Sequence, residues 1–193
     1  MNLSAQQLYG AGPVFLVGSN WLNMTTSVYA QVKTGIGVLS GVTVNTAGTS
    51  SAVALYDGIS SVVTISLASP GVITWNGHPF KAGDPVVFET TSALPTGLTA
   101  GTVYYVSITG LTANAFEVSD TKAHALAGTN MINTSVSQAG VQTAWDLSNP
   151  IGTFATTAQN NVPLGVNGVQ FQNGLIASAT DGGGAANITI LYL

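Results

Sequence analysis

The chain has 193 residues, enough for one domain or two small ones with a stable buried core. Asp, Glu, Lys and Arg make up 5% of the residues, arginine is absent and the net charge is −4, whereas an ordinary soluble domain has about 25% charged residues. This composition excludes nucleic-acid backbones and anionic membrane surfaces as partners, and the lack of cysteine excludes disulfides and thiolate metal sites.

The first part of the chain, residues 1–33, carries no charged side chain before Lys33. Gly, Pro and Asn interrupt its apolar residues, so no run approaches the roughly 18 that a membrane-spanning helix needs, and no basic segment of a secretory signal precedes them. One short helix is expected within residues 4–10. Because the range 1–33 has no clean period, we interpret it as an N-terminal arm or edge segment that packs on a neighbouring chain.

Beyond this segment, apolar residues alternate with polar ones, and this period of two is typical of half-buried strands. Val63, Ile65 and Leu67 share one face of the first such run, and the pattern recurs at 102–110, 115–120 and 187–193. Clusters of Gly, Pro, Asn and Asp separate the runs at turn spacings. The sequence therefore predicts an all-β fold: an outer, jelly-roll-like β-sandwich with a small β-barrel or sandwich module inserted in one loop.

A shift in composition divides the chain into an outer and an inner part. Residues 34–58 and 151–193 are rich in Gly and Ala and almost free of charge, whereas most charged side chains lie within 62–143. We expect 34–61 plus 144–193 to form the outer domain and 62–143 to form the inserted module. The two crossing points, Asp57-Gly58 and Trp145-Asp146, should then lie close in space.

Residues 71–121 contain a distinctive series of short motifs: Gly71-x-Ile73-Thr74, His78, Ala82-Gly83-Asp84, Leu94-Pro95-x-Gly97-Leu98, Tyr104-Tyr105-Val106 and Ala115-Phe116. The series resembles a recurrent small β-module of tailed bacteriophage virion proteins. The flanking stretches GVLSGVTVNTAGTSSAVALYDG and IGTFATTAQ are similar to small phage head-associated proteins. The resemblance implies a structural protein located in the virion.

The connector within this module, residues 86–106, places a stretch of Thr, Ser, Pro and Gly between two strand-like flanks. Gly83 supplies a positive φ before the first flank, and Pro95 with Gly97 forms a turn. Leu94 and Leu98 are expected to anchor the connector to the core. The connector therefore shapes a surface and performs no chemistry.

Side chains that could carry chemistry are few and scattered. His78 is expected to bond to local backbone, and His124, in the expected loop 121–126, to be solvated. Asp57 and Asp84 are typical turn or cap residues, and Asp181 would offer an oxygen to Ca²⁺ only with partners that the sequence does not show. No P-loop, dinucleotide fingerprint or G-x-S-x-G pattern occurs, so we predict no enzyme, no catalytic residue, no metal and no cofactor.

The sequence is compatible with three functions from different classes. The first is a capsid decoration or cement protein that binds and stabilises the shell. The second is a tail fibre or spike module that binds a host surface glycan through exposed Trp75, Tyr104 or Tyr105, although packing across strands is the favoured role of these aromatics. The third, a depolymerase, is disfavoured because no long β-helical repeat is visible.

The N-terminal segment favours the decoration role, since the chain has no heptad or repeated shaft of a fibre. Leu8, Phe15, Trp21 and Leu22 are predicted to bury against a partner, either the major capsid protein or another virion protein. We also expect a homo-oligomer, a trimer by analogy with the threefold positions of icosahedral shells. Neither nucleic acid nor membrane is expected as a partner.

Overall fold

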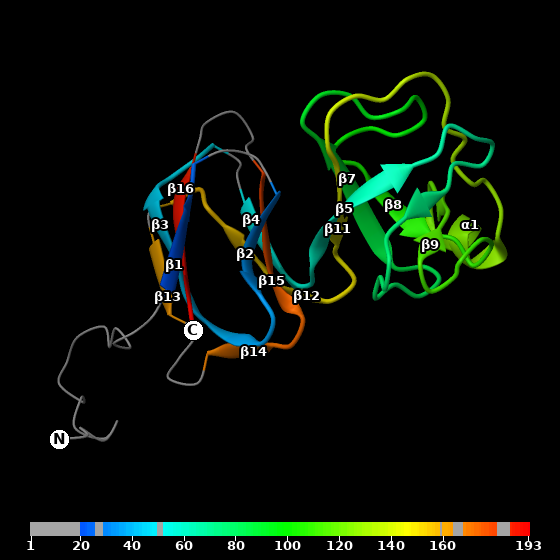
Figure 1. Cartoon of the computed structure of the whole chain (residues 1–193). Coiled ribbons are helices and arrows are strands. Elements are labelled where there is room, and N and C mark those ends of the chain that lie inside the picture. The colour runs from blue at the N-terminus through cyan, green and yellow to red at the C-terminus, as the bar shows by residue number, and fades with distance from the viewer. Residues whose placement is uncertain (1–19, 26–28, 50–51, 159, 164–167, 181–185) are drawn as a thin grey trace, which may run out of the picture.

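The computed structural model describes residues 20–25, 29–49, 52–158, 160–163, 168–180 and 186–193. Among these residues the fold is all-β, as predicted, with a two-layered sandwich and a separate curled sheet (Figure 1). One sandwich layer, the outer sheet, has the order β1-β16-β3-β13, with β14 also paired to β3. Its strands are β1 (Asn20–Met24), β3 (Gly37–Thr46), β13 (Asn160–Pro163), β14 (Val169–Phe171) and β16 (Asn187–Tyr192).

The other sandwich layer, the inner sheet, has the order β12-β4-β15-β2 and lies between the outer sheet and the curled sheet (Figure 1). Its strands are β2 (Tyr29–Thr34), β4 (Ala52–Asp57), β12 (Pro150–Ala155) and β15 (Gly174–Thr180). Since β13 and β14 pair with successive parts of β3, they act as one interrupted strand. The chain crosses between the layers in the strand order of a jelly roll, which confirms the predicted fold class.

Alternation along the strands builds the sandwich core. On β16, Ile188 and Ile190 are buried while Thr189 between them is half-buried on the opposite face. The same alternation on the other strands brings apolar side chains from both layers together. This core consists of Met24, Val32, Leu39, Val42, Val53, Leu55, Phe171, Leu175, Ala177, Ile188 and Ile190.

The loop between β4 and β12 holds the curled sheet, which has the order β10-β8-β7-β11-β5-β6-β9. Its strands are β5 (Ser60–Ile65), β6 (Ile73–Thr74), β7 (Pro85–Thr90), β8 (Val103–Val106), β9 (Ala115–Phe116), β10 (Val118–Ser119) and β11 (Gln142–Asp146). Only Glu117 separates β9 from β10, and these strands pair with opposite ends of the sheet. One short segment thus brings the two ends together, and the sheet is a nearly closed barrel.

Aromatic packing fills this barrel. Phe80 contacts Trp75 and Phe116 edge to face, with ring centroids 5.3 and 5.0 Å apart. Leu98 is buried in the same core and Leu94 packs against it, so the connector is anchored by its own leucines as predicted. The connector also forms isolated β-bridges to the segment that precedes β11, and Gly83 has the predicted positive φ of 84°.

The helix α1 (Lys122–Ala127) corrects the expectation of a loop at 121–126. Thr121 caps its N-terminus by accepting a hydrogen bond from the His124 N–H, and Gly128 ends it in the left-handed conformation. The helix is too short to show a helical period, so only its caps marked it in the sequence. The helix expected within residues 4–10 lies outside the described residues.

The two crossing segments lie side by side, as expected. The Asp146 N–H donates to the Ile59 carbonyl at 3.0 Å, and the Asp57 N–H donates to the Asn149 carbonyl at 2.8 Å. The side chain of Gln31 on β2 makes hydrogen bonds to the inner sheet and to the first crossing segment. Its amide nitrogen lies 2.7, 3.2 and 3.3 Å from the carbonyl oxygens of Lys33, Leu175 and Gly58. Its oxygen accepts the Ser60 N–H at 2.9 Å.

A small apolar junction joins the inner sheet to the barrel. Val87, Leu147 and Ile176 form its buried centre, and Tyr29 packs on Trp145 with ring centroids 5.8 Å apart. Burial raises the pKa of the Tyr29 hydroxyl above its ordinary value. The barrel sheet itself runs from Ser60 to Asp146, slightly beyond the expected module range of 62–143.

Candidate interaction surface

The described part of the predicted arm belongs to the sandwich. Leu8 and Phe15 lie outside the described residues. Trp21 and Leu22 both lie on β1, an edge strand of the outer sheet. Because successive strand residues point to opposite faces, Trp21 faces outward and is 66% exposed, whereas Leu22 packs against the sandwich core. The structure therefore separates these two predicted partner-binding residues onto different faces.

A ladder of amides and hydroxyls lies beside Trp21 on the same outward face. Asn23 of β1 and Asn45 of β3 both donate to the Asn187 side-chain oxygen of β16, at 2.6 and 2.8 Å. Both also donate to the Thr189 hydroxyl, at 3.2 and 2.8 Å. These bonds tie three neighbouring strands together on the outside. We call Trp21, Asn23, Asn45, Asn187, Thr189 and Leu191 the β1 face.

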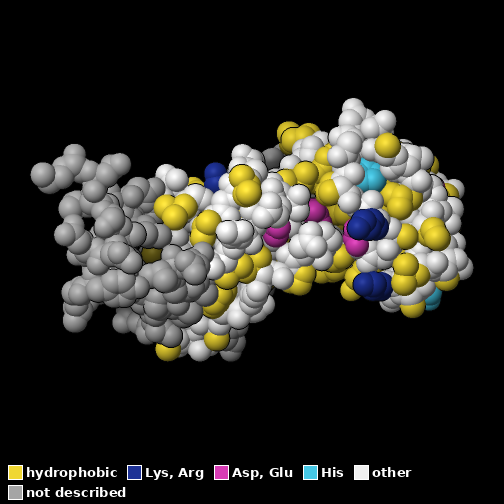
Figure 2. All heavy atoms as spheres, turned by 90° about the horizontal axis from the view of Figure 1, so that it is seen from below, with side chains coloured by type: hydrophobic (Ala, Val, Ile, Leu, Met, Phe, Trp, Pro, Cys, Tyr) yellow, Lys and Arg dark blue, Asp and Glu magenta, His cyan; other side chains and the backbone are white. Residues whose placement is uncertain are grey.

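The β1 face belongs to a sheet without formal charge. None of the strands β1, β3, β13, β14 and β16 contains Asp, Glu, Lys, Arg or His. The outer sheet is also the layer that lies farthest from the barrel (Figure 1). Charged side chains gather instead toward the middle of the molecule and on the barrel (Figure 2). The β1 face is thus an uncharged surface with one large exposed aromatic.

The aromatics considered for glycan binding lie in the barrel. Trp75 and Tyr104 are each 6% exposed and form part of the barrel core. The Tyr104 hydroxyl accepts a hydrogen bond from the Thr99 N–H at 2.9 Å, which satisfies its polar end. Tyr105 is half-buried opposite Pro85. Packing is therefore confirmed for Trp75 and Tyr104, and neither ring is available to stack on a sugar.

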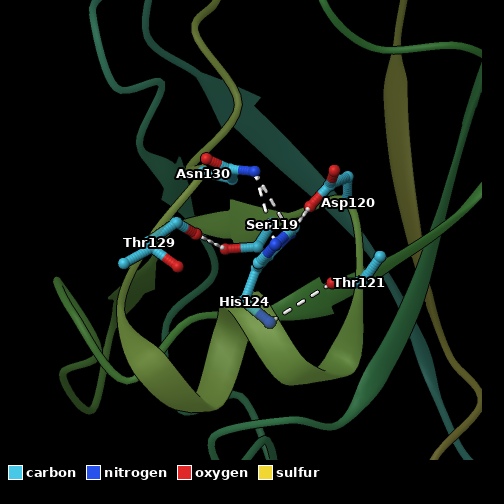
Figure 3. Close-up of polar contacts among 6 residues, drawn as sticks. All are labelled: Ser119, Asp120, Thr121, His124, Thr129 and Asn130. Atoms are coloured by element: carbon cyan, nitrogen blue, oxygen red, sulfur yellow. Dashed lines mark hydrogen bonds and ion pairs between the residues drawn. The ribbon is translucent and has the colours of Figure 1, made fainter.

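The two histidines have separate environments. The His78 Nδ1 accepts the Phe80 N–H at 3.3 Å, which confirms the expected local backbone bond. His124, on α1, is half-exposed, and its Nδ1 lies 2.5 Å from an Asp120 carboxylate oxygen (Figure 3). This hydrogen bond lowers the pKa of Asp120. The Ser119 hydroxyl beside this pair donates to the Thr129 carbonyl at 2.9 Å, so it is not arranged as an activated nucleophile.

The carboxylates hold backbone turns. Asp57 accepts the N–H groups of residues 172–174 at 2.7 to 3.3 Å, and Asp84 accepts the Lys81 N–H at 2.7 Å, so both act as the predicted turn residues. Asp146 is 1% exposed, and burial, with Asp84 and Asp57 nearby, raises its pKa. The described residues contain no group of three His, Asp or Glu side chains placed to hold a metal ion. Asp181 lies outside them.

Neither a family model nor a curated protein nor a solved structure matches the chain. In the parts of the chain that the structure covers, no helix has both the length and the apolar character required to cross a membrane. Among the described residues, the β1 face combines the largest exposed aromatic side chain, Trp21, with the absence of charge.

Proposed function

We propose that the protein is a structural component of a tailed-phage virion, a capsid decoration or cement protein that binds the shell through the β1 face. The observation that carries the proposal is the exposed Trp21 on an uncharged sheet at the end of the molecule remote from the barrel. The resemblance of residues 71–121 to a phage virion module supplies the biological setting. The proposed role is one of binding, without catalysis or a metal.

The chemistry of the β1 face suits burial against another protein. Charged residues are depleted and aromatic residues enriched at the buried centre of interfaces. Burying a large apolar side chain contributes about 1.5 to 3 kcal/mol. Trp21 is 66% exposed, so most of that contribution is still available to a partner. On the same face, the side-chain amides of Asn23 and Asn45 supply hydrogen-bonding groups, which donate to the Asn187 side-chain oxygen.

Jelly rolls occur both in viral capsid proteins and in lectins, so the fold alone does not separate shell binding from glycan binding. The side chains favour the shell. Trp75 and Tyr104, which a glycan-binding module would need to expose, are in the barrel core. The charge-free sheet extends beyond Trp21 across all its strands, a wider uncharged area than a single stacked sugar requires.

The test is binding of the purified protein to particles of the encoding virus that lack it, measured by co-sedimentation. Trp21→Ala is expected to raise the dissociation constant at least about tenfold, as for a central aromatic of an interface. Val62→Ala is the matched control, because Val62 is also 66% exposed but lies on the barrel. The free energy of unfolding of each variant should lie within about 0.5 kcal/mol of the wild-type value.

Equal binding by Trp21→Ala and the wild type would refute the role of the β1 face. Binding of the wild type to host surface polysaccharide, lost in Trp21→Ala, would instead support the receptor-binding alternative. Electron cryomicroscopy of intact particles provides the independent check, since the proposal requires density for the jelly roll on the head with β1 toward the shell or a neighbouring copy.

A further inference from the structure

The edge strands of the sandwich differ in how they are protected from pairing with other strands. Natural edge strands are blunted by proline, β-bulges or charged side chains. In the inner sheet, β12 begins with Pro150 and has a register shift against β4, and β2 contains Lys33 and has a register shift against β15. In the outer sheet, β13 ends with Pro163.

The strand β1 has none of these protections. Its sequence, NWLNM, lacks proline and charge, and its register against β16 is regular over all 5 residues. Among the described residues it pairs on one side alone, with β16. It also carries the exposed Trp21. An edge with these properties is a template for the addition of another strand.

The side chains of β1 define the strand that fits. An added antiparallel strand must be apolar opposite Leu22, which packs against the core, and must lack charge opposite Trp21 and Asn23, which face outward. A second copy of β1 meets both conditions. Its lack of charge matters particularly here, because a two-fold pairing sets the same strand against itself, so charges of one sign on β1 would face charges of the same sign and repel.

The register of such a pairing follows from the period of two. Directly opposite residues must point to the same face, so outward residues pair with outward residues and inward with inward. The register that also overlaps all 5 residues of β1 places Leu22 opposite Leu22 of the second copy. Trp21 then lies opposite Asn23 of the second copy, and Asn20 lies opposite Met24.

We propose that two copies of the chain associate through antiparallel pairing of β1 with β1 about a two-fold axis at Leu22. The two outer sheets become one continuous sheet whose β1 faces, with both Trp21 side chains, form a single uncharged surface. For its biological use this pairing rests on the proposed function, because it doubles the surface offered to the shell. It predicts a dimer, or an assembly of dimers, in place of the trimer expected from the sequence.

The test uses paired substitutions at the two exposed outward positions of the full-length chain. Trp21→Glu with Asn23→Glu, and separately Trp21→Lys with Asn23→Lys, place like charges directly opposite each other across the two-fold axis. Each variant alone should be monomeric, with the dimer dissociation constant raised at least about tenfold. An equimolar mixture of the acidic and basic variants should form a one-to-one heterodimer that high salt weakens.

A third double variant tests the register of the pairing. The variant that combines Trp21→Glu with Asn23→Lys places opposite charges across the axis and should be dimeric by itself. Mass is measured by sedimentation velocity and native mass spectrometry, with thermal unfolding of each variant to show that it is folded. The control carries Val62→Glu on the barrel and should remain dimeric, since Val62 is exposed far along the chain from β1.

A monomeric or trimeric wild type, like-charged variants that remain dimeric, or a mixture that forms no heterodimer would each overturn the proposal. A monomeric combined variant would overturn the register and with it the axis at Leu22. Failure here is distinguishable from failure of the proposed function, because mass is measured without particles. Particle binding by a monomeric wild type would support the proposed function while overturning the pairing.

Discussion

The hydrogen bonds of the Gln31 side chain provide the sharpest test of what stabilises the crossing between the sandwich and the barrel. Gln31→Met keeps the length of the side chain but removes its amide. The amide nitrogen lies near three carbonyl oxygens, at 2.7, 3.2 and 3.3 Å, but has two hydrogens to donate. With the bond accepted from the Ser60 N–H at 2.9 Å, about three hydrogen bonds are lost.

Each such bond contributes about 0.5 to 1.5 kcal/mol net, and the half-buried position reduces the total toward the lower end. We expect Gln31→Met to lower the free energy of unfolding by about 2 kcal/mol, which corresponds to about 4 to 8 °C in Tm for a chain of this size. Urea and thermal unfolding followed by circular dichroism measure both quantities.

Gln170→Met is the matched control, since Gln170 is exposed on β14 of the outer sheet, whereas Gln31 lies on the inner sheet. It should change stability by less than about 0.5 kcal/mol. If Gln31→Met lowers the free energy of unfolding by no more than this control, the Gln31 hydrogen bonds do not stabilise the crossing and the reasoning is refuted.

Three further predictions concern the buried carboxylate, the barrel and the helix. Burial raises the pKa of Asp146, so wild-type stability should fall as the pH rises through that raised pKa. Asp146→Asn retains an acceptor for the Ser148 N–H and should reduce the fall in Tm between pH 4 and 8. The same fall in Tm in this variant as in the wild type would contradict the role of the Asp146 carboxyl. Replacing the segment between Gly58 and Leu147 by a short Gly-Ser linker should leave a folded sandwich by circular dichroism, because its ends are already adjacent, whereas insoluble product would contradict separability. Thr121→Ala should cost about 1 kcal/mol in urea unfolding through loss of the helix cap, and Thr121→Ser should cost less.

Local features of the chain could be predicted from the sequence because their causes are local. Alternation of apolar and polar residues marks a strand wherever one face is buried, so the run that contains Ile188 and Ile190 was recognised. The turn at Gly83 and the anchoring of the connector by Leu94 and Leu98 depend on neighbouring residues, and the structure confirms them. The sequence does not predict helix α1, because six residues are too few to show a helical period.

The place of each strand was decided by tertiary structure. The alternation in β1 shows no more than that Trp21 and Leu22 face opposite ways; pairing with β16 decides that Leu22 meets the core and Trp21 meets solvent. Burial of Trp75 and Tyr104 likewise follows from closure of the barrel by residues far along the chain.

The candidate surface shows the same division between local and tertiary causes. The sequence by itself determined that charge is scarce and that strands alternate, since both are properties of the chain and its neighbours. Only the tertiary structure decided that Asn23, Asn45 and Asn187 form one ladder beside Trp21, and that β1 is an edge. The physical reason is that hydrogen bonds between strands join residues more than a hundred positions apart, and no local pattern records which strands will meet.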